Sequence, residues 1–159
     1  MIAGYITIPG APWPVLPPGI HPATLQEVEQ HFAYNARRRQ LFQGLVDAAT
    51  NLAQAGCQGL YLDGSYVTDK PVPGDFDVCW NPQGVDRQLL DPVFSQFSNK
   101  RAAQKQKFGG EFFLSTTRAD AQGRTFIDFF QIEKFTGQSK GIILIDLTSD
   151  PMLQPQVTP

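Results

Sequence analysis

The strongest constraint on the fold lies in residues 60–80, where two short apolar runs flank a loop with two prolines and a glycine. In the second run, Asp75 and Asp77 alternate with Phe76 and Val78. Because successive side chains of a strand point to opposite faces, both aspartates project from one face, and the apolar pair enters the core. The pattern predicts two buried strands with acids on one of them.

Two carboxylates on one strand face repel each other strongly in a low dielectric, so something must compensate them. The residues leave three explanations open, which are a divalent cation, arginine partners, or a solvated strand end. The last is the plain structural interpretation of Asp75 and Asp77. Among cations, ligands that are all oxygen favour Mg²⁺ over zinc.

A third acid, Asp128, lies in the apolar segment TFIDFFQI, where a charge needs a reason. Residues 111–118 and 124–132 predict two strands joined as a hairpin by residues 119–123. If the strand of Asp128 lies beside that of the aspartate pair, the three carboxylates surround a two-metal site. Glu111 is the alternative third acid, and an exposed edge-strand position is the plain interpretation of Asp128.

Helices are predicted before and after these strands. Thr24 and Glu27 match a capping box that starts a helix, a basic stretch over residues 35–40 indicates a break, and Gly56 ends the second helix. Apolar spacing predicts a further helix over 85–97, which Pro92 either interrupts or restarts. The arginines of the basic stretch are interpreted as a solvated helix face.

The bulk composition indicates one domain, residues 1–159, with a proline-rich N-terminal arm over 1–23 and a loose tail over 151–159. The arm is expected to lie extended, with apolar anchors at Trp13, Val15, Leu16 and Ile20. The fold class is expected to be α/β, with a small mixed sheet and helices mainly on one face.

Charge and apolar runs exclude several classes of function. The net charge is −2, which gives no general attraction to nucleic acid or membranes. The longest apolar run is too short to span a bilayer, and no signal peptide is evident. With two cysteines and two histidines, a disulfide framework or a zinc cluster is not expected, and a cytoplasmic location fits best.

An apolar strand ending in Gly64-Ser65, a loop, an Asp75-Phe76-Asp77 strand and a later Asp128 follow in that order. The arrangement resembles the nucleotidyltransferase domain of the DNA polymerase β superfamily, especially its minimal single-domain members. The resemblance covers roughly residues 42–132. Its Gly-Ser and Asp-x-Asp unit carries most of the likeness, while an ordinary turn is the plain interpretation of Gly64-Ser65.

The resemblance implies Mg²⁺-dependent transfer of a nucleoside monophosphate from a nucleoside triphosphate to a protein or RNA acceptor. It implies that Asp75, Asp77 and Asp128 hold metal and carry catalysis, and that Gly64 and Ser65 hold the triphosphate. Lys70 is the basic residue that the loop offers for a phosphate contact. Minimal members often act in toxin–antitoxin or phage-defence pairs. The alternative is a catalytically weak or inactive relative that works by binding a protein partner.

Overall fold

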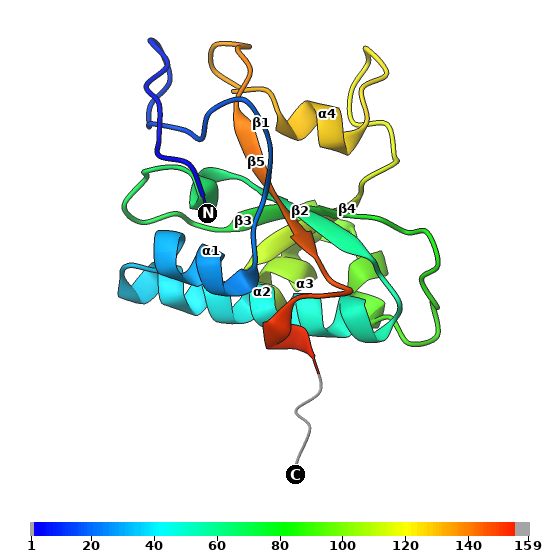
Figure 1. The fold of residues 1–159 in the computed structure, drawn as a ribbon. Helices are drawn as coiled ribbons and strands as arrows, with labels where there is room; N and C mark the ends of the chain where they lie inside the picture. The colour runs from blue at the N-terminus through cyan, green and yellow to red at the C-terminus, as the bar shows by residue number, and fades with distance from the viewer. Residues whose placement is uncertain (1, 155–159) are drawn as a thin grey trace.

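A five-stranded mixed sheet is the centre of the fold in the computed structural model, which describes residues 2–154 (Figure 1). Its strands are β1 (Gly19–Pro22), β2 (Gly59–Asp63), β3 (Phe76–Trp80), β4 (Gly110–Leu114) and β5 (Gly141–Asp146). Their order is β1-β5-β2-β3-β4. The β1–β5 and β3–β4 pairs are parallel, and β2 is antiparallel to both of its neighbours.

Helices cover the two faces of this sheet unequally. The α-helices of the described residues are α1 (Leu25–Phe32), α2 (Ala36–Gln54), α3 (Ser98–Phe108) and α4 (Phe126–Phe130). Short 3₁₀ helices are η1 (Ser65–Val67), η2 (Pro92–Ser95) and η3 (Pro151–Leu153). Figure 1 shows α1, α2 and α3 on one face and α4 on the other. The predicted fold class, a mixed sheet with helices mainly on one face, is confirmed.

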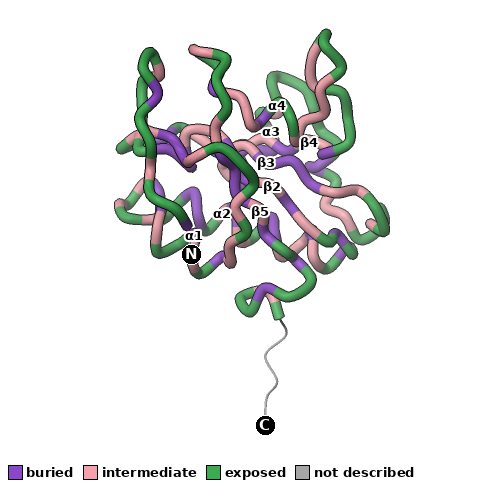
Figure 2. Tube along the Cα trace, turned by 45° about the horizontal axis from the view of Figure 1, so that its top comes forward, coloured by how far each residue is buried: buried purple, intermediate pink, exposed green. Residues whose placement is uncertain are grey.

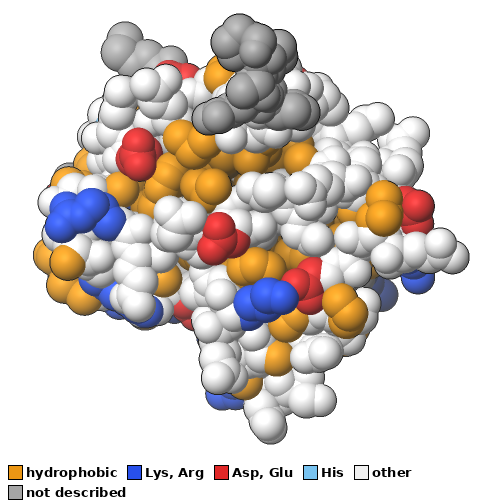
Figure 3. Space-filling model, turned by 90° about the horizontal axis from the view of Figure 1, so that it is seen from below, with side chains coloured by type: hydrophobic (Ala, Val, Ile, Leu, Met, Phe, Trp, Pro, Cys, Tyr) orange, Lys and Arg blue, Asp and Glu red, His pale blue; other side chains and the backbone are white. Residues whose placement is uncertain are grey.

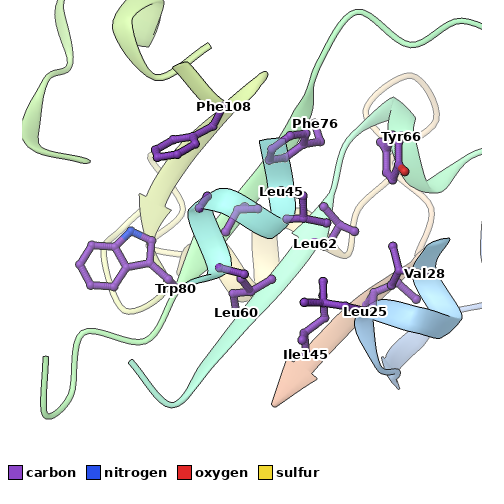
Figure 4. Packing of buried hydrophobic residues seen from close by; sticks show 14 of the residues in the cluster. Leu25, Val28, Leu45, Leu60, Leu62, Tyr66, Phe76, Trp80, Phe108 and Ile145 are labelled. Carbon is purple, nitrogen blue, oxygen red and sulfur yellow. The ribbon is translucent and has the colours of Figure 1, made fainter. Parts of the chain in front are cut away.

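The main core lies between the sheet and the three larger helices. Alternate residues of β2 and β3, among them Leu60, Leu62 and Val78, point to this side and are fully buried. They pack against Leu45 of α2 and Ile145 of β5 in one cluster (Figure 4). Figure 2 shows the buried stretches running along the central strands. Burial of these side chains is the main source of stability.

Surface charge on the helical side is dispersed. Seen from that side, acidic and basic side chains are scattered among apolar ones (Figure 3). No helix in residues 2–154 is long and apolar enough to cross a membrane.

Two of the three signals predicted at the helix ends are confirmed, and the third is displaced. The capping box at α1 is present, with the Thr24 hydroxyl accepting from the Glu27 amide and the Glu27 carboxylate accepting from the Thr24 amide. A break does separate α1 from α2, but it lies at residues 33–35 rather than over 35–40, because residues 36–40 form the first turns of α2 after the Asn35 cap. Gly56 follows α2 with a φ of +95°, a conformation that favours glycine.

The N-terminal arm includes β1, which pairs with β5 and so docks the arm on the sheet. Val15 and Leu16 are buried anchors as predicted, whereas Trp13 and Ile20 are exposed. At the other end, Leu153 packs on the core cluster, so the predicted loose tail begins later than residue 151. Residues 155–159 of that tail lie outside the described residues.

Two predicted elements are wrong. Residues 85–91 form turns rather than a helix, so the long helix over 85–97 is wrong. The alternative, a short helix restarted at Pro92, is confirmed as the 3₁₀ helix η2, in which proline at the first position sacrifices no hydrogen bond. The segment 124–132 is not a strand, because residues 126–130 form α4. Thr125 caps this helix, and Phe126 and Phe130 pack one turn apart on the sheet with Phe113.

Candidate functional site

Four carboxylates gather at one end of the central strands. In the sheet, Asp77 of β3 is paired with Asp63 of β2 on one side and with Glu111 of β4 on the other. Directly paired residues project from the same face, so these three acids share the face opposite Val78. Asp75 lies two residues before Asp77, and it precedes β3 rather than starting that strand as the sequence predicted.

This crowding perturbs the protonation of the aspartate pair. Burial, reinforced by Asp63, Asp75 and Glu111, raises the pKa of Asp77 to about 8, and Lys140 opposes that rise. The pKa of Asp75 is also raised, first by burial and then by Glu111. Carboxyl groups with raised pKa values beside like charges are typical of functional sites.

The two flanking acids have cationic partners, and the central pair has none. The Lys140 ammonium pairs with Asp63 and also donates to the Phe130 carbonyl at 2.6 Å. Lys105 pairs with Glu111 at 3.3 Å. Within the described residues, no ion pair or side-chain hydrogen bond involves the carboxylate of Asp75 or Asp77. The central pair is therefore left to an external cation or a proton.

The Gly64-Ser65 turn lies directly against Asp77 of this pair. Gly64 has a φ of +88°, and a Cβ at this position would lie 3.1 Å from both the backbone nitrogen and Oδ2 of Asp77. Glycine is therefore required here for its conformation and for the close approach of the two chains. Ser65 begins η1, and its carbonyl accepts from the Thr68 hydroxyl at 2.6 Å.

The loop between the turn and the acids is held by two arginines of α2. The buried guanidinium of Arg38 donates to the carbonyls of Tyr66, Thr68 and Lys70 at 2.6 to 2.7 Å. Arg37 donates to carbonyls at the far end of the same loop. The two arginines therefore hold the loop through its backbone carbonyls.

The interpretation of the arginine run as a solvated face is therefore wrong for Arg38 and holds for the exposed Arg39. The helical repeat contains the signal that was missed. Arg38 lies three and seven residues before Leu41 and Leu45, on the apolar stripe of α2. Lys140 was also missed, and its only signal is a lone cation next to the apolar strand β5.

One cavity of about 1460 Å³ contains most of these groups. The predicted residues that line it are Gly64, Ser65, Lys70, Asp75 and Asp77, and Asp63 lines it as well. Seven of the 13 Lys and Arg residues of the chain also line it, namely Arg37, Lys70, Lys105, Lys107, Arg124, Lys134 and Lys140. In a chain of net charge −2, this concentration of cations around acids suits a metal-bound polyphosphate.

Asp128 is not brought to this group. Its carboxylate is exposed on α4, where it accepts from the Thr125 hydroxyl at 3.3 Å, and it does not line the cavity although Phe129 and Phe130 do. The predicted convergence of three acids through Asp128 depended on a strand that is a helix. The acids that flank the pair are instead Asp63 and Glu111, the second of which the sequence left open.

The site offers carboxylate oxygens as its donors for a metal ion. In residues 2–154, no group of three or more His, Cys, Asp or Glu side chains is arranged to hold a metal. Two carboxylates are enough for Mg²⁺, which commonly binds one or two of them and completes its shell with water and substrate phosphates. The unpaired Asp75 and Asp77 fit this mode.

Comparison with known proteins gives a family whose function is unknown. No curated protein and no solved structure matches the chain. A family model described as a family of unknown function, DUF6932, matches residues 11–146, which include the sheet, the acids and the cavity. The chain therefore belongs to the DUF6932 family.

Proposed function

We propose that this protein is a Mg²⁺-dependent nucleotidyltransferase that moves a nucleoside monophosphate from a nucleoside triphosphate to a protein or RNA acceptor. One observation carries the proposal. An unpaired aspartate pair with raised pKa values lies against a Gly-Ser turn, inside a cavity lined by seven cationic side chains. That combination suits a polyphosphate bound through a divalent cation.

The proposed roles follow from the contacts. Asp75 and Asp77 would hold Mg²⁺, which supplies charge stabilisation at the α-phosphate and the departing pyrophosphate. Gly64 permits close approach of the backbone to a phosphate, and the Ser65 hydroxyl and Lys70 ammonium donate to its oxygens. These assignments keep the residues that the sequence resemblance implied, apart from Asp128.

The third acid is assigned to Glu111. Both Glu111 and Asp63 flank Asp77. Asp63 lines the cavity but is buried and held by Lys140, whereas Glu111 lies beside the cavity lining, is partly exposed, and pairs with Lys105, which does line it. The partly exposed ion pair of Glu111 is therefore the weaker of the two, and Glu111 can leave its lysine more easily. It would accept the proton of the acceptor hydroxyl as that oxygen bonds to the α-phosphorus and the bond to pyrophosphate breaks.

The test is pyrophosphate release from each of the four nucleoside triphosphates with Mg²⁺, with and without cell RNA or protein as acceptor. Asp77→Asn should lower the rate by about 100-fold or more, since it removes a metal-holding charge. Asp128→Asn is the matched control and should stay within twofold of wild type. Equal losses in the two variants, or an unchanged rate in Asp77→Asn, would overturn the assignment.

A second function, partner binding without catalysis, has one observation in its favour. Two of the four acids are neutralised by lysines, and no three-ligand group is arranged for a metal in the described residues. A protein of this kind would show no thermal stabilisation by Mg²⁺ with triphosphate and no pyrophosphate release. The enzyme proposal expects a rise in Tm with both ligands together, and loss of that rise in Asp77→Asn.

A further inference from the structure

Exposed aromatic side chains line the same cavity. Trp13, Phe129 and Phe135 are 37, 42 and 63% exposed, and all three contribute to its walls. The cavity therefore has an aromatic part as well as a charged part. Large exposed apolar side chains within a cavity point to a ligand that covers them.

Trp13 and Phe135 lie on segments that are tied down rather than loose. The arm is held by bridges of Val15 to Ile6 and to Thr68, and the Asp69 amide donates to the Pro14 carbonyl at 3.0 Å. These contacts lie on both sides of Trp13 along the arm. These contacts therefore hold Trp13 in its exposed position.

The turn that bears Phe135 is organised around one buried carboxylate. Glu133 accepts from the amides of Phe135 and Thr136 and from the Thr136 hydroxyl at 2.7 to 3.1 Å. Gly10 of the arm lies against this turn, since a Cβ there would be 3.2 Å from the Thr136 side chain. Figure 1 shows the arm and the segment before β5 rising from the same side of the sheet.

We propose that Trp13 and Phe135 bind the nucleobase of the nucleoside triphosphate by stacking, while its phosphates lie over the cations and acids of the same cavity. This inference rests on the proposed function and adds the substrate's recognition group. Stacking on aromatic rings accepts every base, because each has a π face. The expected specificity is therefore broad, with purines bound more tightly than pyrimidines because their rings are larger.

Tryptophan fluorescence gives a direct reading. The chain has two tryptophans, and Trp80→Phe leaves Trp13 as the reporter. Titration with ATP should quench Trp13, whereas inorganic tripolyphosphate, which lacks a base, should not. Calorimetry on the chain with both tryptophans provides a second measurement if the Trp80→Phe variant does not fold.

The matched variants are Phe135→Ala and Phe97→Ala. Phe97 is similarly exposed at 56% but does not line this cavity. Phe135→Ala should raise the Kd for ATP by about 10-fold and leave tripolyphosphate binding unchanged. Phe97→Ala should leave both unchanged. Equal ATP affinity in wild type and Phe135→Ala, or quenching by a single-stranded RNA but not by ATP, would overturn the proposal.

The two proposals fail separately. One outcome is that ATP quenches Trp13 and Phe135→Ala weakens ATP binding, but no pyrophosphate is released under any condition. That outcome would support the base site and contradict the transferase function. Pyrophosphate release with the same KM in wild type and Phe135→Ala would support the transferase and remove the base site.

Discussion

The two faces of the β2–β3 pair use neighbouring residues in opposite ways. On the helical face, Leu62 and Val78 are paired across the strands and are fully buried. One residue along, Asp63 and Asp77 are paired in the same manner on the other face, where like charges meet. One face thus contributes stability through apolar burial, and on the other face burial and the neighbouring carboxylates oppose ionisation of Asp77.

The residues that stabilise the fold and the residues of the candidate site are therefore separated by a single step along each strand. A slip of one residue in register would exchange the two faces entirely. Substitutions on the helical face should therefore change the free energy of unfolding, and substitutions on the acidic face should change ligand binding while sparing or raising that free energy. Four predictions test this separation, from the largest expected effect to the smallest.

Leu62→Ala should lower the free energy of unfolding by about 3 kcal/mol, because it opens a cavity in the main core. Chemical denaturation measures the loss. The control is Leu89→Ala, at a position 57% exposed, which should cost less than about 0.5 kcal/mol. Similar costs at the two positions would contradict the assignment of stability to the helical face.

Arg38→Met should cost about 2 kcal/mol, because it removes the guanidinium that donates to the carbonyls of Phe32, Tyr66, Thr68 and Lys70. Amide exchange should rise across the Tyr66–Lys70 loop, which links the core to the acids. Arg39→Met, one residue along and exposed, should change neither quantity. If exchange in the loop stayed at the wild-type rate, Arg38 would not be its brace.

Asp77→Asn should raise the free energy of unfolding by about 1–2 kcal/mol at pH 8 and by almost nothing at pH 4. The pKa of Asp77 is raised from 3.8 to about 8, so the folded protein keeps a proton that the unfolded chain releases in this window. The free energy of unfolding of the wild type therefore falls as pH rises from about 4 to 8. The asparagine side chain does not titrate, so the variant lacks this pH dependence.

Denaturation curves over this pH range provide the measurement for Asp77→Asn. Mg²⁺ should reduce the difference in the free energy of unfolding between wild type and variant at pH 8, because a bound cation compensates the ionised aspartates in the wild type alone. A variant that is less stable than wild type at pH 8 would show that the acidic face does not oppose ionisation of Asp77.

Asp128→Asn should have the smallest effect, less than about 0.5 kcal/mol on unfolding, because its carboxylate is exposed and accepts a long, exposed hydrogen bond from the Thr125 hydroxyl. Thermal denaturation at neutral pH measures it. A large destabilisation here would mean that α4 depends on this carboxylate, against its exposure on the surface.

Sequence reasoning succeeded where the signal was local. The alternation around Asp77 predicted its strand, although Asp75 lies just before that strand, and Gly64 indicated a turn, which agrees with its φ of +88°. The capping box at Thr24 placed the start of α1. Side-chain periodicity, glycine conformation and helix capping are short-range effects, so neighbouring residues alone determine them.

Tertiary structure determined which acidic and basic side chains lie next to one another. Phe126 and Phe130 pack on Phe113 and make a helix of the segment around Asp128, which the apolar run alone does not distinguish from a strand. Strand register set Glu111 beside Asp77, and Lys140 reaches Asp63 from 77 residues away. Pairing across strands depends on long-range packing, for which a single sequence carries no periodic signal.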